Sequence, residues 1–456
     1  MNESASSGPT FGLGILVPAT LVLLVIALLA GRRIPSLQGR FLFAAIWLRM
    51  LLGAYHVYMF KPLVAGMSGN ALVSIAVAGI GLLVIRLPHL MLRALLPVYL
   101  IMMLVLVSGL LNMDIPGIMT VMVKYSYFVV LLVATFEAMR QDEDEQLMPM
   151  LIWAFAPLLL FQWLSLALHL PKGSEMGDGV VWIGGYNHEA AFSVALLAAF
   201  IVGCLAHRLH PAIRLGYLLA VAIGIFLAGY RTSIFAAGPM MLVVFWAAMT
   251  EYVSPSQRRV IAATALMIAL VGAAAVAVLY HERFADMGTF LSNPGALIKP
   301  PREFTQIDRH VLSARPLIWS EYLYAYMDGR PFQIMFGFGP ESWARGFDVY
   351  PHNTLIGTLY ELGAVGVGAM LLLWIAMAAK SVMARRWDRP MLVAAHLSFF
   401  LLNFGTMPFW LMEGLALYAV LCGYSLFSAR ENLQRRSQPG WADYPNLFEP
   451  RMRAAL

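Results

Sequence analysis

Long runs of apolar residues recur along nearly the whole chain, and short connections that carry most of the charges separate them. A helix needs about 20 mostly apolar residues to cross a bilayer. Runs that meet this rule lie at about 11–30, 41–60, 71–88, 94–112, 116–138, 147–170, 187–206, 215–230, 232–250, 260–280, 353–379, 391–408 and 412–428. The pattern predicts an all-α, polytopic integral membrane protein with about 12–13 transmembrane helices.

The composition supports this prediction and excludes a water-soluble protein. The chain is 60% hydrophobic and 12% charged, whereas soluble domains are about 45–50% apolar and about 25% charged. The net charge of +6 does not indicate nucleic acid binding, because the basic residues lie in the connections between apolar runs. That placement is typical of cations that orient a membrane protein.

The basic residues are unevenly divided between alternate connections. Fourteen occupy one set, and the other short connections hold three. The larger set is Arg32, Arg33, Arg40, Arg86, Arg93, Arg140, Arg208, Arg214, Arg258, Arg259, Lys380, Arg385, Arg386 and Arg389; the smaller is Lys61, Lys172 and Arg231. Because short cytoplasmic loops are rich in Lys and Arg, the larger set is expected inside. The N-terminus is then outside and the C-terminus inside.

This orientation divides the chain into four parts. Residues 1–280 carry ten predicted helices, and residues 353–428 carry three more. Between them, residues 281–352 form one large loop on the outer side, and residues 429–456 form an inner tail. Connections in compact proteins have a median of about 4–6 residues, so a loop of this size indicates function.

One stretch of the loop, "SARPLIWSEYLYAYMDG", reads as a helix of its own. Ser313 is the expected N-cap, Pro316 lies in the first turn, and Gly329 follows the end. These are the usual start and stop signals of a helix. Its Trp and Tyr side chains suit a helix that lies at a membrane surface.

The loop ends in "YPHN", at the mouth of the next predicted helix. On an ideal helix with about 100° per residue, Gly363 shares the azimuth of His352 and Gly366 lies about 40° away. We therefore expect both glycines below His352, where they let another helix approach closely. Asn353 follows His352 at the mouth, and Glu361 points to the opposite side, where it could brace a neighbouring helix.

Two cations lie where charge is costly in a membrane protein. Arg231 is at the outer tip of the tight hairpin "LAGYRTSIFAAGP", and it is either an interfacial side chain or a ligand for an anion. Lys124 lies about seven residues, or ~10 Å, below the outer surface. It requires either a carboxylate partner or a water-filled cavity.

Other polar residues are expected on the same outer side. Asn187 and His188 lie at another helix mouth, where they either cap the helix or contact substrate. Arg315 opens the loop helix, and both a helix N-terminus and a guanidinium suit phosphate oxygens. A solvated surface arginine is the alternative. Arg309 is a further cation of the loop and a candidate substrate contact.

Taken together, Lys124, Arg231, Arg315 and His352 predict an outward-facing pocket for a polyanion with one titratable group. The sequence contains no HExxH, no Walker loop and no GxSxG. Cys204 and Cys422, the only cysteines, lie inside apolar runs, so neither a disulfide nor a thiolate metal site is expected. We expect metal-free chemistry without a cofactor, and His352 is the candidate proton acceptor.

The run His352-Asn353, nine residues, then Gly363-Ala-Val-Gly366 resembles the signature of the O-antigen ligase family, which includes related Wzy-type polysaccharide polymerases. The hairpin arginine in "AGYRTSIFAAG" resembles the same family. So does "ARPLIW" followed by "FGFGPE" in the loop before the histidine. The resemblance covers mainly residues 220–370. Thr232 and Ser233 depart from it, because the family usually has smaller residues after the arginine.

The resemblance implies a GT-C-like, metal-independent glycosyltransferase at the periplasmic face of a bacterial inner membrane. Its donor would be a glycan on undecaprenyl diphosphate, and its acceptor a sugar hydroxyl on lipid A-core or on a growing glycan. Arg231 and Arg315 would hold the diphosphate, and His352 would accept the proton of the hydroxyl or position it. Lys124, Asn353, Asn187, His188, Arg309 and Glu361 are the further substrate-binding candidates. Membrane lipids, and no nucleic acid, complete the expected partners.

Two other classes of function stay open. A transporter such as a lipid-linked oligosaccharide flippase would suit the many spans and the intramembrane Arg49, His56 and Lys124. For Arg49 and His56, however, structural pairing is the preferred interpretation. A non-catalytic scaffold would use the long loop for docking. Within the glycosyltransferases, no residue separates a ligase from a polymerase.

Overall fold

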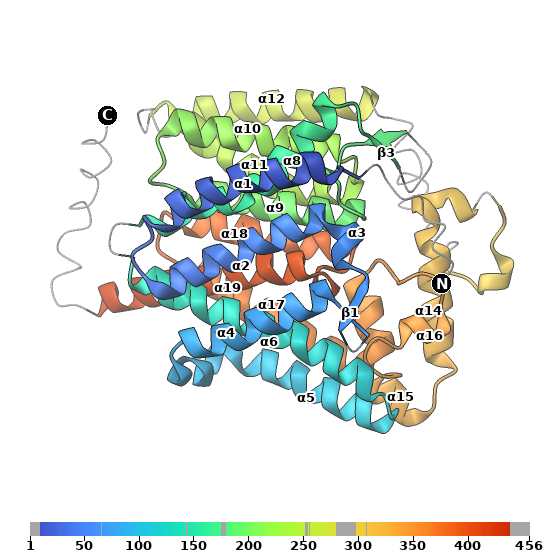
Figure 1. The fold of residues 1–456 in the computed structure, drawn as a ribbon. Coiled ribbons are helices and arrows are strands. Elements are labelled where there is room, and N and C mark those ends of the chain that lie inside the picture. Colours follow the sequence, from blue (N-terminus) through green and yellow to red (C-terminus); the bar gives the residue numbers. More distant parts are fainter. Residues whose placement is uncertain are drawn as a thin grey trace.

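The structure is a computed structural model, and it describes residues 10–64, 66–142, 145–174, 179–250, 254, 256–279, 298–306 and 308–437. This part of the chain is mostly helical (Figure 1). Its strands form two small antiparallel hairpins, β1 (Pro62–Val64) with β2 (Met67–Ser68) and β3 (Lys172–Gly173) with β4 (Val180–Val181). An all-α protein was the prediction.

Each of the predicted apolar runs coincides with a helix or with a continuous helical segment. In chain order these are α1 (Leu13–Gly31), α2 (Leu37–Ala54), α4 (Gly69–Val84), α5 (Leu96–Leu111), α6 (Ile115–Arg140), α7 (Leu147–Leu151) with η3 (Ile152–Phe155) and α8 (Ala156–Ala167), α9 (Glu189–Leu205), α10 (Pro211–Leu227), α11 (Arg231–Thr250), α12 (Arg258–Leu279), α17 (Thr354–Val382), α18 (Arg389–Leu402) and α19 (Met412–Arg436). In the described residues, eight helices are long and apolar enough to cross a membrane. A multi-pass membrane protein is compatible with this set.

Short elements complete the connections. They are α3 (His56–Met59), η1 (Leu87–Met91), η2 (Arg93–Leu95), η5 (Pro301–Glu303), η6 (Asp308–Ala314), α14 (Arg315–Met327), α15 (Pro331–Phe336), α16 (Trp343–Gly346) and η7 (Pro408–Trp410). The predicted tail begins as the last turns of α19, which continues to Arg436. Residues 438–456 of that tail and residues 281–297 and 307 of the predicted loop lie outside the described residues.

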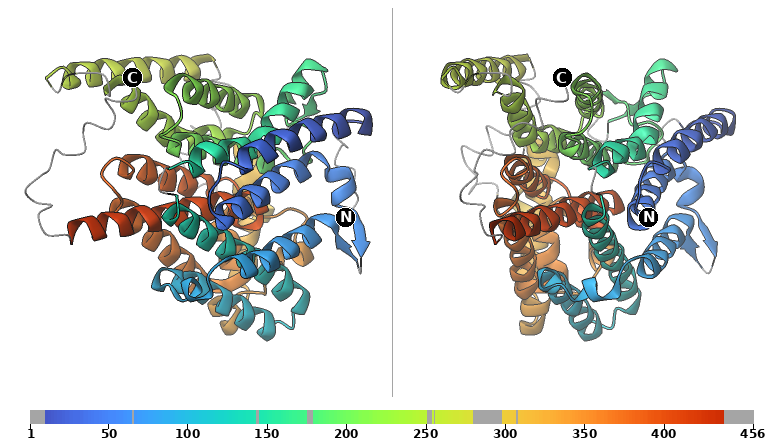
Figure 2. Two further views of the ribbon diagram at one scale, coloured as in Figure 1. Left: turned by 60° about the vertical axis from the view of Figure 1, so that its left-hand side comes forward. Right: turned by 90° about the vertical axis from the view of Figure 1, so that its left-hand side faces the viewer.

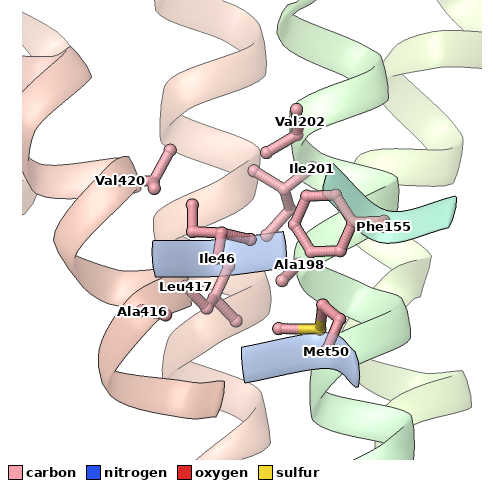
Figure 3. Close-up of a pocket in the computed structure, with 9 residues that line it drawn as sticks. All are labelled: Ile46, Met50, Phe155, Ala198, Ile201, Val202, Ala416, Leu417 and Val420. Carbon is pink, nitrogen blue, oxygen red and sulfur yellow. The ribbon is translucent and has the colours of Figure 1, made fainter. Parts of the chain in front are cut away.

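The apolar helices lie side by side in one bundle, and α19 runs through its interior (Figure 2). α19 packs against α6, α9, α17 and α2, and its apolar stretch is fully buried. α12 lies at the edge of the bundle against α11. A cavity near the middle of α2 and α9 is lined by apolar residues, among them Ile46, Met50 and Leu417 (Figure 3). This cavity therefore offers no polar side chain to a ligand.

The two ends of the bundle differ. At one end, α14, α15 and α16 lie across the helix ends, close to the start of α17 and to β3 (Figure 1). We call this the loop end. At the opposite end lie the start of α18 and the last turns of α19. α1 begins at the loop end and α19 finishes at the opposite end, as an odd number of crossings would require.

The loop helix α14 confirms the predicted element but corrects its start. Pro316 lies in its first turn, and Gly329 follows its end. Ser313, however, does not cap it. Leu312, Ser313 and Ala314 all have positive φ, at 47°, 61° and 62°, and Ala314 occupies the cap position without a side-chain hydrogen bond. The helix begins only at Arg315 because these left-handed residues turn the chain sharply before it.

α17 corrects a second prediction, because it is not one ideal helix. Gly363 has φ 71° and ψ −170°, which breaks the helix. A Cβ at Gly363 would lie 2.3 Å from the carbonyl oxygen of Met335, so only glycine allows α15 to approach this closely. The close approach of another helix expected at Gly363 is therefore confirmed, and the helix that approaches is the short loop helix α15.

The break in α17 frees two carbonyl groups that a continuous helix would satisfy internally. The turn "FGFG" supplies replacement donors, since the N–H of Phe338 donates to the Tyr360 carbonyl (2.9 Å) and that of Gly339 donates to the Glu361 carbonyl (3.2 Å). The hydroxyl of Ser108 also donates to Glu361, at 2.8 Å. This pairing fixes the loop onto the upper part of α17.

Candidate functional site

The candidate site is built around the residues that precede α17. Asn353 is the N-cap of α17, and its side-chain oxygen accepts hydrogen bonds from the N–H groups of Leu355 (2.9 Å) and Ile356 (3.2 Å). The side-chain oxygen of an N-cap asparagine typically accepts hydrogen bonds from the first turn of its helix. The predicted contact of Asn353 with substrate would have to come from the remaining amide nitrogen, which lies 3.4 Å from the Phe404 carbonyl.

His352 lies just before this cap, and its backbone is in the left-handed region with φ 50°. Such a conformation is uncommon for residues other than glycine and tends to occur at functional sites. The imidazole packs on the ring of Tyr350, with centroids 4.0 Å apart. Its Nδ1 is shielded from solvent and has no hydrogen-bond partner among the described residues. A buried polar atom without a partner is uncommon and marks His352 as a candidate functional residue.

The surroundings of His352 keep its ring neutral. Burial, followed by the nearby charge of Arg315 and by His188, lowers the pKa of His352 to about 3. Both burial and cationic neighbours disfavour an imidazolium. The neutral ring can accept one hydrogen bond and donate another over the whole physiological range of pH.

Arg315 reaches this place from the start of α14. Its Nη2 donates to the hydroxyl of Tyr230 at 3.5 Å, and that hydroxyl donates to the Gly405 carbonyl at 2.8 Å. One turn further along α14, the indole N–H of Trp319 donates to the carbonyl of Pro351 at 2.9 Å. The second bond ties α14 to the residue before His352, so the arginine and the histidine are held together.

Arg231 follows Tyr230 directly and opens α11. The hairpin between α10 and α11, the start of α14 and the start of α17 therefore meet at one place. All three residues that the sequence predicted as catalytic come from these segments. We use the term loop-end site for His188, Tyr230, Arg315, Tyr350 and His352.

His188 belongs to the same site. As the N-cap of α9, its Nδ1 accepts the N–H of Ala190 at 3.2 Å, so the predicted cap is confirmed. Its Nε2 lies 3.4 Å from the Tyr350 hydroxyl. Tyr350 therefore connects the two histidines, a link that the sequence analysis missed. The only signal for it was the position of Tyr350 two residues before His352.

Two other predicted contacts lie further out. Asn187 has an exposed side chain, and its backbone carbonyl accepts a hydrogen bond from Lys172. Arg309 is also exposed, and its charge acts on Glu321 of α14. Their roles in substrate binding stay predictions.

Lys124 and Glu361 meet in a separate cavity at the same end. Lys124 forms an ion pair with Glu341 of the turn that follows "FGFG", which provides the carboxylate partner expected for a lysine at this depth. Glu361 accepts a hydrogen bond from the indole N–H of Trp410 at 3.4 Å. These residues line a cavity of about 20 Å³, enough for about one water molecule. Neither Lys124 nor Glu361 forms a hydrogen bond or ion pair with His352 or Arg315.

The other intramembrane charges are paired structurally. The guanidinium of Arg49 lies 2.9 Å from the Glu413 carboxylate and also donates to Asn70. The Nδ1 of His56 lies 2.6 Å from the Gly185 carbonyl. Structural pairing, the preferred interpretation of both residues, is confirmed.

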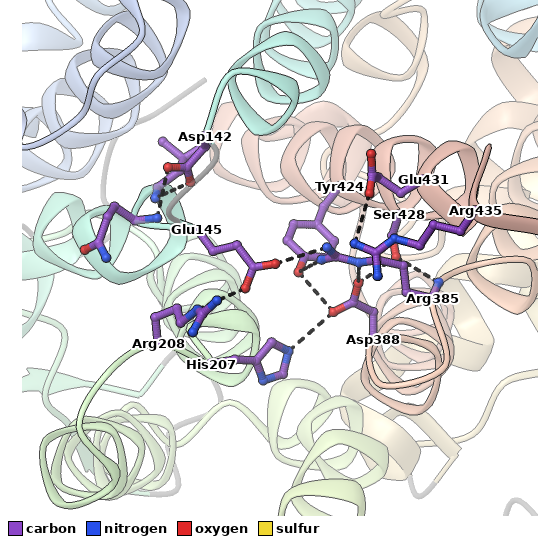
Figure 4. A network of polar contacts seen from close by, with 12 residues as sticks. Asp142, Glu145, His207, Arg208, Arg385, Asp388, Tyr424, Ser428, Glu431 and Arg435 are labelled. Atoms are coloured by element: carbon purple, nitrogen blue, oxygen red, sulfur yellow. Dashed lines mark hydrogen bonds and ion pairs between the residues drawn. The ribbon is translucent and has the colours of Figure 1, made fainter. Parts of the chain in front are cut away.

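A second polar cluster lies at the opposite end of the bundle (Figure 4). We call it the Asp388 cluster: Glu145, His207, Arg385, Asp388, Tyr424 and Ser428. Arg385 Nε lies 2.6 Å from Asp388, and its Nη1 lies 3.1 Å from Glu145. The hydroxyls of Ser428 and Tyr424 donate to Asp388 at 2.6 and 3.1 Å.

In the Asp388 cluster, neighbouring groups lower the pKa of Asp388 by more than burial raises it. Burial alone would raise the pKa of Asp388, but the contact with His207, the charge of Arg385 and the Ser428 hydroxyl together lower it to about 2. Asp388 in turn raises the pKa of Arg385. The sequence analysis counted Arg385 only as an orienting cation and missed its partners.

No protein-family profile matches the chain, and no curated protein sequence matches it either. The geometry of the site therefore has to carry the functional argument. Among the described residues, no three His, Cys, Asp or Glu side chains are grouped as metal ligands would be. Cys204 and Cys422 are both buried and free.

Proposed function

We propose that this protein is an integral membrane glycosyltransferase of the O-antigen ligase or Wzy-type polymerase kind. It would move a glycan from undecaprenyl diphosphate to a sugar hydroxyl at the periplasmic face of a bacterial inner membrane. The proposed protein has about 12–13 spans in a GT-C-like arrangement, and the loop end faces the periplasm. The reaction requires neither metal nor cofactor.

The observation that carries the proposal is the state of His352. A neutral imidazole with a buried, unpartnered Nδ1 is held beside an arginine at the start of a helix. This arrangement suits a hydroxyl that approaches an anionic leaving group. In addition, Arg315 offers a guanidinium to phosphate oxygens at the start of α14.

In the proposed reaction, the acceptor hydroxyl oxygen attacks the anomeric carbon of the donor. The new glycosidic bond forms as the bond from that carbon to the diphosphate oxygen breaks, and the diphosphate leaves with the electron pair. Arg315 and Arg231 stabilise the charge that develops on this leaving group. His352 orients the hydroxyl and takes its proton.

The apolar cavity inside the bundle favours this proposal over a carrier. Carriers bind their substrates near the middle of the membrane. Here the cavity at that level is lined by apolar side chains, and Arg49 and His56 are engaged in structural contacts. His352, with its buried and unpartnered Nδ1, lies at the loop end instead.

The test uses the full-length protein reconstituted in vesicles without metal or nucleotide. An undecaprenyl-diphosphate-linked oligosaccharide is supplied alone and together with lipid A-core, and the products are separated on a gel. A ladder from the donor alone indicates a polymerase, and a product that requires lipid A-core indicates a ligase. If neither product forms while the donor crosses the membrane, the glycosyltransferase proposal is wrong and a transporter replaces it.

A further inference from the structure

We propose that an anion bound at Arg315 controls whether His352 can take up a proton. This inference deepens the proposed function and rests on it for the identity of the anion, a diphosphate. It concerns a different property, the linkage between anion binding and proton binding. The linkage can be measured without any glycan transfer.

The geometry places Arg315 and His352 in a fixed relation. Trp319 of α14 is hydrogen-bonded to the carbonyl of Pro351, directly before His352. Tyr230, directly before α11, accepts a hydrogen bond from the guanidinium of Arg315. Both contacts are partly buried, and together they keep the guanidinium of Arg315 near the imidazole of His352 while α14 remains docked.

Two neighbouring groups oppose a second positive charge at His352. Arg315 comes from α14, and His188 comes from the cap of α9. Tyr350, whose ring lies against the imidazole, and Tyr230 are uncharged phenols. Among the described residues, no carboxylate forms an ion pair with Arg315 or His352. An anionic ligand beside Arg315 would therefore supply a negative charge that no ion pair with Arg315 or His352 provides.

This charge balance determines the strength of His352 as a base. Burial and the charges of Arg315 and His188 lower the pKa of His352 to about 3, and such a base holds a proton in only about one molecule in 10⁴ at pH 7. An opposite charge within about 4–6 Å raises the pKa of a histidine by roughly 1–3 units. A diphosphate between Arg315 and His352 would thus restore much of the lost basicity.

The proton balance of the proposed reaction fits this control. The proton of the acceptor hydroxyl goes to the imidazole, which becomes an imidazolium beside Arg315. The departing diphosphate gains one negative charge as its bond to the sugar breaks, so the two new charges offset each other. The base is consequently effective only when the donor is present, and this restricts proton abstraction to the complete complex.

The first experiment is calorimetric titration of inorganic pyrophosphate into the purified full-length protein. Two buffers that differ in ionisation enthalpy are used at about pH 6, near the ordinary histidine pKa of about 6.5. We expect a fraction of a proton to be taken up with each pyrophosphate bound. His352→Gln should lose this uptake, and His396→Gln should retain it. His396 is a matched control because it is buried against Ser425.

The second experiment covers the case in which free pyrophosphate does not bind. Carbon-13 labelling of histidine and nuclear magnetic resonance follow the titration of His352 in the unliganded protein, and the His352→Gln spectrum assigns its signal. Arg315→Gln should raise the pKa of His352 above the wild-type value, although burial still holds it below about 6.5. An unchanged titration in Arg315→Gln overturns the inference, as does pyrophosphate binding with equal proton uptake in wild type and His352→Gln.

These outcomes are distinct from failure of the proposed function. Glycan transfer without the proton linkage overturns only the present inference. Proton linkage without transfer overturns the glycosyltransferase assignment but leaves an anion-dependent histidine in place.

Discussion

The two ends of the bundle each place a histidine near an arginine. At the loop end these are His352 and Arg315, and at the opposite end they are His207 and Arg385. In the Asp388 cluster two carboxylates neutralise the arginine, and two hydroxyls complete the shell of Asp388. At the loop-end site no carboxylate pairs with Arg315 among the described residues, and Nδ1 of His352 has no partner.

This difference separates a structural cluster from a site for a ligand. Buried charges that are fully paired hold a fixed arrangement, and removing one partner is costly. Buried polar groups without partners reduce stability, and they are common where a ligand completes them. On this reasoning, changes at the loop-end site should affect chemistry, and changes at the Asp388 cluster should affect stability.

The largest effect should come from His352→Ala. Loss of a general base lowers a rate by about 10²–10⁴-fold, and we expect a fall of this order in glycan transfer, measured by product formation in vesicles. Donor binding and thermal stability should change little. His396→Gln, at a buried histidine away from the site, serves as the control. Full activity in His352→Ala would remove this residue from the mechanism.

The opposite outcome is expected for Arg385→Gln. Breaking a buried ion pair costs about 3–5 kcal/mol, so the unfolding temperature in detergent should fall strongly. Transfer per folded molecule should remain near the wild-type value. Arg208→Ala is the matched control, because the pair between Arg208 and Glu145 is largely exposed and such pairs contribute about 0–1 kcal/mol. Equal losses of stability in the two variants would argue that the ion pairs of Arg385 do not stabilise the fold.

The pH dependence of stability provides a further check of the Asp388 cluster. The pKa of Asp388 is lowered from 3.8 to about 2, so the folded state binds fewer protons than the unfolded state between these values. Stability from this group is present above about pH 4 and is lost as the pH falls towards 2. In Asp388→Asn, the free energy of unfolding should fall less between about pH 4 and pH 2 than it does in the wild type. An identical loss of stability in the wild type and the variant would show that other carboxylates cause the acid sensitivity.

A smaller effect is expected for Arg231→Lys. Lysine keeps the charge but loses the guanidinium fork, and a hydrogen bond to a charged group contributes about 1.5–3 kcal/mol. Transfer should fall by about 10–150-fold, which tests the anion-ligand interpretation against the interfacial one. Normal turnover with lysine would assign Arg231 to the membrane interface.

The smallest effect should come from Tyr350→Phe. This change removes the hydroxyl that lies 3.4 Å from His188 but keeps the ring against His352. An uncharged hydrogen bond contributes about 0.5–1.5 kcal/mol, so transfer should fall only about 2–12-fold. Tyr350→Leu, which removes the ring contact as well, should be clearly worse. If the two variants behave alike, the ring contact does not position His352.

The sequence predicted the helices well because an apolar run of about 20 residues has few alternatives in a membrane protein. It also grouped Arg231, Arg315 and His352 on one side. It missed the break at Gly363, since helical periodicity contains no sign of a left-handed residue. It also missed partners far along the chain, such as Glu341 for Lys124 and Glu145 for Arg385, because tertiary packing decides these pairs.

The hydrogen bonds between the "FGFG" turn and the carbonyls of Tyr360 and Glu361 have a consequence for protein engineering. A chimera that exchanges only residues 298–352 would separate the donors of these bonds from their acceptors. The segment that can be transplanted as a unit therefore extends to Gly363, inside what hydropathy alone would assign to the membrane. A junction placed just after Gly363 keeps the donors and the acceptors of these hydrogen bonds within one parent protein.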